Sequence, residues 1–237
     1  MSDAAQGACM KERPIIFSGE MVCAILEGRK IQTRRVVTVP WRCGKRCLPY
    51  EPYFFAEDGR LYFQDQYGDN HDFEKCYPCP LGATGDHLWV REAFCPDYFD
   101  DWSPAYKADY DLVKYNIERI VPEPKWKPSI HMPRSFSRIK LRITDVRVER
   151  VQDITEEDAI AEGCTDGGCL NCGKSSWPNP CGCERPEPDH KDAFYYLWRK
   201  LYGKRPGLDL HSNPWVWVVK FEQIQNDLVM NHRKSRL

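Results

Sequence analysis

SRIKLRITDVRVERV, the stretch from Ser137 to Val151, alternates apolar with charged or polar side chains. This period of two is typical of a strand with one buried face. The segment from Arg13 to Phe17 is predicted to form a short buried strand, and Pro214 to Phe221 is apolar enough for a central strand. Candidate strands at both ends and in the middle, with few helices between them, favour a barrel over a doubly wound fold.

Three segments carry helical signals. Ser18 is a candidate N-cap for a short helix whose apolar positions have helical spacing and which ends before Gly28. Thr155 followed by Asp158 resembles a capping box, and Gly163 ends that helix. A third helix is expected from about Lys191 to Leu201, with one apolar face. The predicted fold class is therefore mainly β with α, or α+β.

A chain of 237 residues can form one large domain or a smaller domain with insertions. The sequence predicts a single domain over residues 13–224, with a disordered N-terminus at 1–12 and a polar tail at 225–237. Irregular insertions are expected at about 40–80, 95–128 and 164–190, where Pro, Cys and acidic residues gather. We expect the insertions to decorate a common β core.

The formal net charge of −1 conceals a segregated charge pattern. The segment from Glu12 to Cys47 contains eight Lys/Arg and three acidic residues, and the segment from Lys125 to Arg150 contains eight and two. The region from Glu51 to Asp111 has fourteen acidic and four basic residues. If the two basic stretches meet in space, they form a positive face that suits RNA or DNA; ordinary solvated strand faces are the alternative.

No run of about 18 apolar residues is present, which a membrane-spanning helix would need. The N-terminus also lacks the basic and then apolar pattern of a signal peptide. We therefore expect a cytoplasmic protein without a membrane partner. No phosphate-binding loop, dinucleotide-binding glycine pattern or metalloprotease motif occurs, so no organic cofactor is predicted. The sequence leaves the oligomeric state open.

Twelve cysteines are many for a cytoplasmic chain, and most of them occur in close pairs, which indicates metal rather than disulfides. One set combines CxxC and CxC in a loop rich in Gly and Pro, with Cys164 and His190 as possible substitute ligands. The loop has few large aliphatic residues to order it, so structural zinc is the expected organiser; reduced thiols in a flexible loop are the alternative. This first set consists of Cys169, Cys172, Cys181 and Cys183.

A second set of cysteines has a less usual spacing and a long separation between its two pairs. It consists of Cys43, Cys47, Cys76 and Cys79. Four thiolates leave no open coordination position, so both sets are predicted to be structural and not catalytic.

Several short motifs occur in an order that resembles the ASCH family, within the PUA-like superfamily. They are GRKxxTxR from Gly28 to Arg35, GDxxWVRE from Gly85 to Glu92, ITEExA from Ile154 to Ala159 and WVVxF from Trp217 to Phe221. With WKPSIHMPR from Trp126 to Arg134, the chain is most similar to the larger members found in phages and prophages. The resemblance covers these core motifs and not the insertions.

The resemblance implies a PUA-like β-barrel that binds nucleic acid or a modified nucleobase. It also implies an alternative, since one small branch of the family is an amidohydrolase that removes the acetyl group from N4-acetylcytidine. The proposed catalytic positions of that branch correspond to Lys30, Thr33 and Glu162. The chain departs from that branch at Ile31, where the small enzymes have threonine, and in its length.

This trio could perform amide hydrolysis only with a suitable geometry. Thr33 would be the nucleophile, Lys30 the base if its pKa is depressed, and Glu162 an acid or a group that holds Lys30. In a regular strand, however, Lys30 and Thr33 would point to opposite faces, so the mechanism requires a turn near Gly28. The alternative roles are a phosphate-binding lysine, an ordinary strand threonine and a solvated helix end.

Candidate ligand-binding cations accompany these motifs. The loop from Trp126 to Arg134 could stack on a base, and the alternative, which we favour for Trp126, is a loop packed over the mouth of the barrel. Two further functions stay open: a ribonuclease, by family analogy alone, and a zinc-stabilised module for protein interaction. The predicted ligand-binding residues are Arg29, Arg34, Arg35, Arg91 and Arg134.

Overall fold

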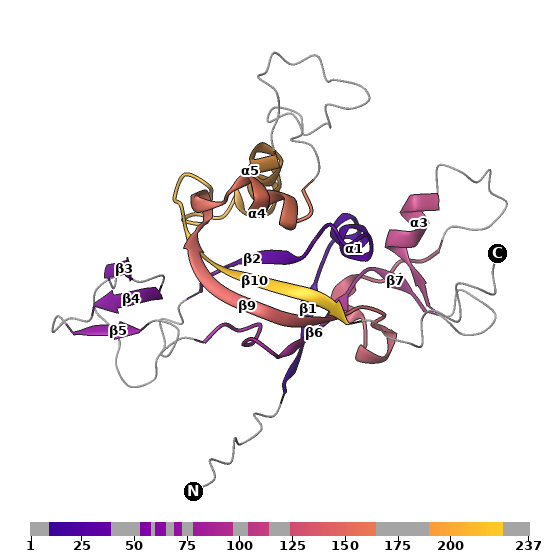
Figure 1. Ribbon diagram of the computed structural model, residues 1–237. Coiled ribbons are helices and arrows are strands. Elements are labelled where there is room, and N and C mark those ends of the chain that lie inside the picture. Colours follow the sequence, from indigo (N-terminus) through magenta and orange to yellow (C-terminus); the bar gives the residue numbers. More distant parts are fainter. Residues whose placement is uncertain are drawn as a thin grey trace, which may run out of the picture. The chain divides into compact units, whose positions relative to one another are not determined.

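The structure of the chain is a computed structural model that describes residues 10–38, 53–57, 60–64, 69–72, 78–96, 104–113, 124–164 and 190–224 (Figure 1). The described chain combines α-helices and β-strands, as the α+β prediction requires. The helices are α1 (Gly19–Leu26), α3 (Lys107–Val113), α4 (Glu156–Ala161) and α5 (His190–Tyr202).

The main sheet has five strands in the order β1-β6-β9-β10-β2. Strand β1 pairs parallel with β6, β6 pairs antiparallel with β9, and β10 pairs antiparallel with β2. Within the described residues this sheet has two edges, β1 and β2, and does not close into the barrel that the resemblance implies. Its strands are β1 (Glu12–Ile16), β2 (Gln32–Val36), β6 (His87–Arg91), β9 (Lys140–Arg150) and β10 (Trp215–Ile224).

Two small sheets lie in segments that the sequence assigns to insertions. One is an antiparallel sheet in the order β3-β4-β5, and the turn predicted at Asp58-Gly59, between β3 and β4, lies outside the described residues. The other pairs β7 with β8. These strands are β3 (Tyr53–Glu57), β4 (Arg60–Gln64), β5 (Asn70–Asp72), β7 (Phe94–Cys95) and β8 (Ala105–Tyr106).

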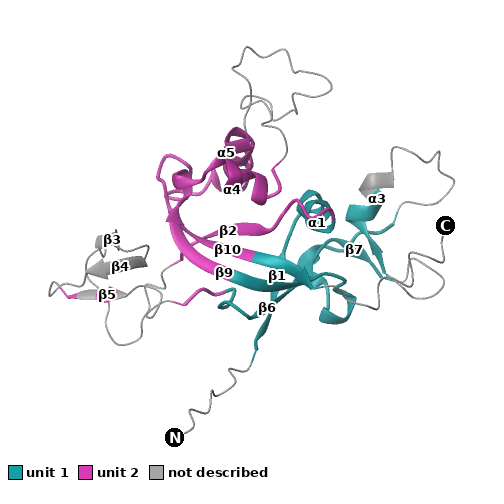
Figure 2. Ribbon diagram, in the orientation of Figure 1, with its two compact units in different colours: residues 1–26, 81–144, 221–237 teal, residues 27–80, 145–220 magenta. Residues whose placement is uncertain are grey.

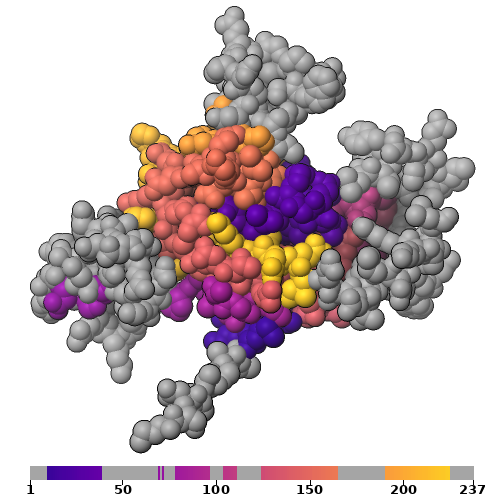
Figure 3. All heavy atoms as spheres, in the orientation of Figure 1, coloured from indigo at the N-terminus to yellow at the C-terminus, as the bar shows by residue number. Residues whose placement is uncertain are grey.

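The chain divides into two compact units (Figure 2). Unit 1 comprises residues 1–26, 81–144 and 221–237, and unit 2 comprises residues 27–80 and 145–220. The strands β9 and β10 each contribute residues to both units. Figure 3 shows the heavy atoms of the chain as spheres, with the described residues coloured along the sequence.

Unit 1 is built around the pleat of β6 and the first half of β9. Leu88 and Val90 alternate toward the interior of β6, and Leu141 and Ile143 do the same in β9. The turn before β6 is held by Asp86, whose carboxylate accepts hydrogen bonds from two backbone amides and from an arginine side chain. Because that carboxylate ties the turn to β1, it sets the start of the strand pair.

Unit 2 packs α4 and α5 against the second half of β9 and the first half of β10. Its core cluster is apolar and consists of Val151, Ile154, Ala159, Phe194, Trp198, Val216 and Val218. The Thr155 hydroxyl accepts a hydrogen bond from the Asp158 amide, as the capping box predicts, and Gly163 follows the helix with a φ of 83°. The residue after α4, Glu162, forms a bridge to Lys30, just before β2.

Candidate functional site

The candidate site in unit 2 begins with a bridge between two distant segments. Lys30 lies just beyond the turn at Gly28, which has a φ of 76°, and forms an antiparallel β-bridge with Glu162, the C-cap of α4. The Ile31 amide donates to the Ala161 carbonyl oxygen at 2.9 Å. The two segments that the motif resemblance requires to converge therefore lie side by side.

The Lys30 side chain is directed at Glu162. Its Nζ donates to the Glu162 backbone oxygen at 2.8 Å and to Oε2 of the same residue at 3.0 Å. Only 2% of the Lys30 side chain and 5% of the Glu162 side chain are exposed. This burial lowers the pKa of Lys30, while the attraction of Glu162 opposes that shift and the charge of Arg35 adds to it.

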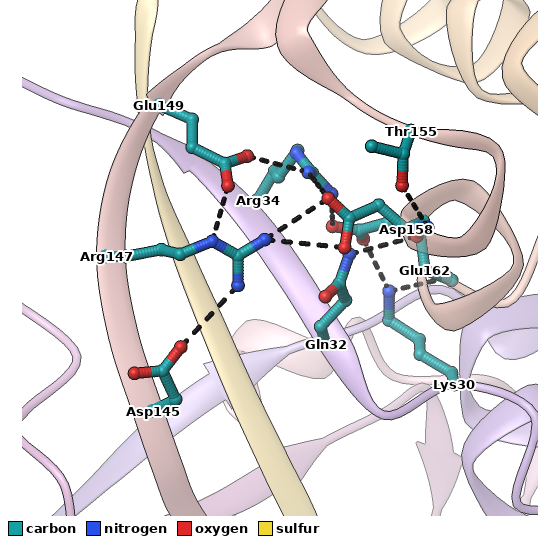
Figure 4. A network of polar contacts seen from close by, with 9 residues as sticks. All are labelled: Lys30, Gln32, Arg34, Asp145, Arg147, Glu149, Thr155, Asp158 and Glu162. Atoms are coloured by element: carbon teal, nitrogen blue, oxygen red, sulfur yellow. Dashed lines mark hydrogen bonds and ion pairs between the residues drawn. The ribbon is translucent and has the colours of Figure 1, made fainter. Parts of the chain in front are cut away.

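Arg34 holds the other oxygen of the same carboxylate (Figure 4). One terminal nitrogen of Arg34 donates to Glu162 Oε1 at 3.2 Å. The other terminal nitrogen donates to Asp158 Oδ2 at 2.7 Å and to Glu149 Oε2 at 3.0 Å. Its side chain is 1% exposed, and Arg34, which the sequence predicts to bind a ligand, lies at the buried centre of a charge network.

Arg147 on β9 forms the outer part of this network. It donates to both oxygens of Asp158, at 3.4 and 3.2 Å, and it is bonded to Glu149 and paired with Asp145 at 3.6 Å. Exposure rises along the network, from Arg34 inside to the half-exposed Asp145 outside. We define the charge network as Lys30, Arg34, Asp145, Arg147, Glu149, Asp158 and Glu162.

The alternation of β2 separates Thr33 from this network. Gln32 and Arg34 both bond to Asp158, Gln32 through its side-chain amide to the Asp158 carbonyl oxygen at 2.9 Å. Successive side chains of a strand point to opposite faces, so Thr33 lies on the other face, where it is buried and paired in register with Val219. The structure brings Lys30 and Glu162 together and does not place Thr33 with them.

Arg29 and Ile31 lie at the surface on either side of Lys30. The Arg29 side chain is 41% exposed, donates to the Gly163 carbonyl oxygen at 3.2 Å and pairs with Glu27. Ile31 is 49% exposed. Arg35 is half-buried on β2, next to its pairing partner Trp217. We call Arg29, Ile31 and Gly163 the bridge rim.

Two predicted ligand-binding arginines belong to unit 1. Arg91 and Arg134 both lie over the ring of Trp89, with 5.3 and 5.7 Å between the guanidinium carbon and the ring centroid. Arg91 donates to the carbonyl oxygens of Met132 and Ile130, and Arg134 pairs with Glu12 at 2.9 Å. These contacts tie the loop after Pro128 to the sheet of unit 1.

A second buried ion pair, between Arg138 and Glu92, lies in unit 1. Arg138 donates to both oxygens of Glu92, at 2.8 and 3.0 Å, and to Asp109 at 2.6 Å, and it lies 4.0 Å from the ring centroid of Tyr106. Burial raises the pKa of Glu92 against the pull of Arg138, and it raises the pKa of Tyr106 to about 12. The alternation of Leu88, Val90 and Glu92 is the signal that points Glu92 inward.

Most of the predicted zinc ligands lie outside the described residues. These are Cys43, Cys47, Cys76, Cys169, Cys172, Cys181 and Cys183. Cys79 is described and buried, and burial raises the pKa of the Cys164 thiol to about 12. Within the described ranges, no group of three or more His, Cys, Asp or Glu side chains is placed to hold a metal ion. Structural zinc therefore stays a prediction.

The arrangement in unit 2 has a definite chemistry. A lysine with a lowered pKa lies in hydrogen-bond contact with a carboxylate, which a second cation holds from its other side. Such a pair can exchange a proton with a bound group, or it can present a hydrogen-bond donor and an acceptor to that group.

No helix of the described chain is long and apolar enough to cross a membrane. No family model, curated protein or solved structure matches the sequence.

Proposed function

We propose that this chain is an ASCH-type protein of the PUA-like superfamily that binds nucleic acid or a modified nucleobase at the bridge rim of unit 2. The bridge between Lys30 and Glu162 is the observation that carries this proposal. The motif resemblance points to these two residues, which are separated in the sequence by two of the predicted insertions. Lys30 Nζ and Glu162 Oε2 lie 3.0 Å apart. A closed barrel and structural zinc in the cysteine loop belong to the same proposal.

The cost of burying charge supports a functional role for this pair. A buried ion pair loses the hydration of both groups, so it is often no more stable than apolar side chains of similar volume. Strongly perturbed titratable groups gather at functional sites for this reason. The buried Lys30, which pairs with Glu162, is flanked in the sequence by the exposed Arg29 and Ile31.

The charge balance of unit 2 favours recognition of a base over recognition of phosphates. Among the cations from Arg29 to Arg35, Lys30 and Arg34 are paired with buried carboxylates. Few cations are then left to contact phosphates at the rim, and each phosphate contact would contribute a slope of about −0.9 in log affinity against log salt. We therefore propose a ligand whose affinity at this site depends mainly on its base.

A titration of nucleosides and short RNA or DNA oligomers at two salt concentrations tests this proposal. Arg29→Gln is expected to weaken binding about tenfold, because it removes a charge-assisted hydrogen-bond donor from the rim. Lys204→Gln, at an exposed position of unit 2 away from the network, serves as the control and should leave the affinity unchanged. Binding of no tested ligand, or equal affinities for the two variants, contradicts the proposal.

The lowered pKa of Lys30 favours a second candidate function, the hydrolysis of N4-acylated cytosine nucleosides. Because Thr33 lies on the other face of β2, we assign the attack to a water molecule. Neutral Lys30 takes a proton from the water as its oxygen adds to the acyl carbon. The bond from that carbon to N4 then breaks, a proton passes to N4, and an acid and the free nucleoside are released.

Acetate release from N4-acetylcytidine tests this second candidate. Lys30→Met and Glu162→Gln are each expected to lower the rate at least about a hundredfold, as is typical for the loss of a general acid or base. Thr33→Val should keep most of the rate if water is the nucleophile. If Thr33→Val is inactive, the nucleophile is the Thr33 hydroxyl rather than water. An unchanged rate of acetate release in Lys30→Met would contradict the amidohydrolase function.

A further inference from the structure

We propose that Arg34 is a positioning residue, which holds the Glu162 carboxylate against the Lys30 ammonium group. The inference rests on the proposed function only in that it gives the pair a ligand to act on. In the sequence Arg34 has the pattern of a ligand-binding cation, within the motif from Gly28 to Arg35. Its contacts give it a different role.

The two oxygens of Glu162 are divided between two cations. Oε2 accepts from Lys30 Nζ at 3.0 Å, and Oε1 accepts from Arg34 at 3.2 Å. A carboxylate with one partner can rotate about its terminal bond, whereas partners on both oxygens fix its plane. Glu162 is 4% exposed, so solvent does not supply an alternative partner.

Arg34 is itself anchored at two further points. One terminal nitrogen contacts Asp158 on α4 and Glu149 on β9, while the other is directed at Glu162. Arg34 Nε is buried and has no hydrogen-bond partner among the described residues, so the terminal nitrogens alone orient the guanidinium group. A planar fork can span these carboxylates, which a lysine ammonium group cannot.

Arg147 provides a matched comparison within the same network. It shares Asp158 and Glu149 with Arg34, and its described contacts include Asp145 but not Glu162. Removing either arginine takes one cation from the same carboxylates. Only the loss of Arg34 also releases the carboxylate that contacts Lys30.

The consequence can be measured at Lys30 itself. Without Arg34, the full charge of Glu162 is left to Lys30, which favours the protonated lysine and raises its pKa. The charged or titratable groups that act on Lys30 include Glu162, Arg35 and Cys164, and these three residues are unchanged in the Arg34 variants. Arg34→Lys keeps a positive charge at this position, so a shift of the Lys30 titration in that variant reports the position of Glu162 rather than the loss of a charge.

The experiment is an NMR titration of protein with isotope-labelled lysine side chains, in which Lys30→Arg identifies the Lys30 signal. Arg34→Gln is expected to raise the Lys30 midpoint by about one pH unit, equivalent to about tenfold in the protonation equilibrium. Arg34→Lys should raise it as well, because one ammonium group cannot hold all three carboxylates. Arg147→Gln should leave the midpoint at the wild-type value.

Equal midpoints in Arg34→Gln and wild type, or equal shifts in the Arg34 and Arg147 variants, overturn the positioning role. If Arg34→Gln does not fold, the shift in Arg34→Lys decides the question in the same way. The titration needs no ligand, so a failure of nucleoside binding would remove the proposed function and leave this test intact. If nucleosides bind but Lys30 titrates unchanged in both Arg34 variants, only the positioning role is lost.

Discussion

Glu162→Leu is expected to lower the free energy of unfolding by about 3–5 kcal/mol, because it leaves buried cations without their carboxylate. Lys30 and Arg34 are 2% and 1% exposed at their side chains and both bond to Glu162. Neither group can turn toward water without opening the contact between α4 and β2. Urea unfolding of the wild type and of Glu162→Leu, followed by circular dichroism, measures the difference in the free energy of unfolding.

Glu157→Leu is the matched control, since Glu157 is an exposed glutamate on the same helix. It should change the free energy of unfolding by no more than about 0.5 kcal/mol, as is usual for a surface position. If Glu162→Leu loses no more stability than Glu157→Leu, the ion pairs of Lys30 and Arg34 with Glu162 are not buried, which would contradict the described network.

Arg138→Met is expected to destabilise unit 1 by a similar amount, about 3–5 kcal/mol, because it leaves Glu92 buried without its partner. The Arg138 and Glu92 side chains are 15% and 2% exposed. The effect should depend on pH. Burial already raises the pKa of Glu92 in the folded chain, and the loss of Arg138 raises it further.

The sign of this dependence follows from proton binding. Above the ordinary carboxyl pKa of 4.5, the folded variant keeps a proton on Glu92 that the unfolded chain has lost. Its free energy of unfolding should therefore fall as the pH rises from about 4.5 toward the raised pKa. Urea unfolding at several pH values measures this slope, with Arg142→Met at an exposed position as the control. A slope equal to that of the control would contradict the assignment.

Local patterns in the sequence anticipate the elements of the fold well. The alternation from Ser137 to Val151 corresponds to β9, and the expected third helix corresponds to α5 with one more residue at each end. The N-cap at Thr155 is observed as a hydrogen bond. Each of these features depends on neighbours in sequence, which is the range over which pleat, helical turn and capping operate.

The order and register in which the strands pair could not be predicted from the sequence. Strand β1 pairs parallel with β6, and the segments β7, β8 and α3 lie where an irregular insertion was expected. Register between distant strands depends on packing that a single sequence does not display. The predicted closed barrel stays a proposal, because the described strands form a sheet with two edges.

The site was predicted in part. Lys30 and Glu162 were selected by resemblance, and they meet. Arg34 is predicted from the sequence as a ligand-binding cation, whereas in the structure it contacts three acidic residues, Glu149, Asp158 and Glu162. The partners of Arg34 lie more than a hundred residues away in the sequence, so its place in the network depends on the fold and cannot be read from neighbouring residues.

The most direct test of the central claim, that the bridge rim is a binding site, is a map of backbone amide shifts on adding a saturating nucleoside. If the bridge rim binds the base, the largest changes occur at Ile31, Glu162 and Gly163, which form or adjoin the bridge. Changes confined to unit 1, for example at Trp89 and Arg134, or no changes with any base-bearing ligand, would contradict the claim.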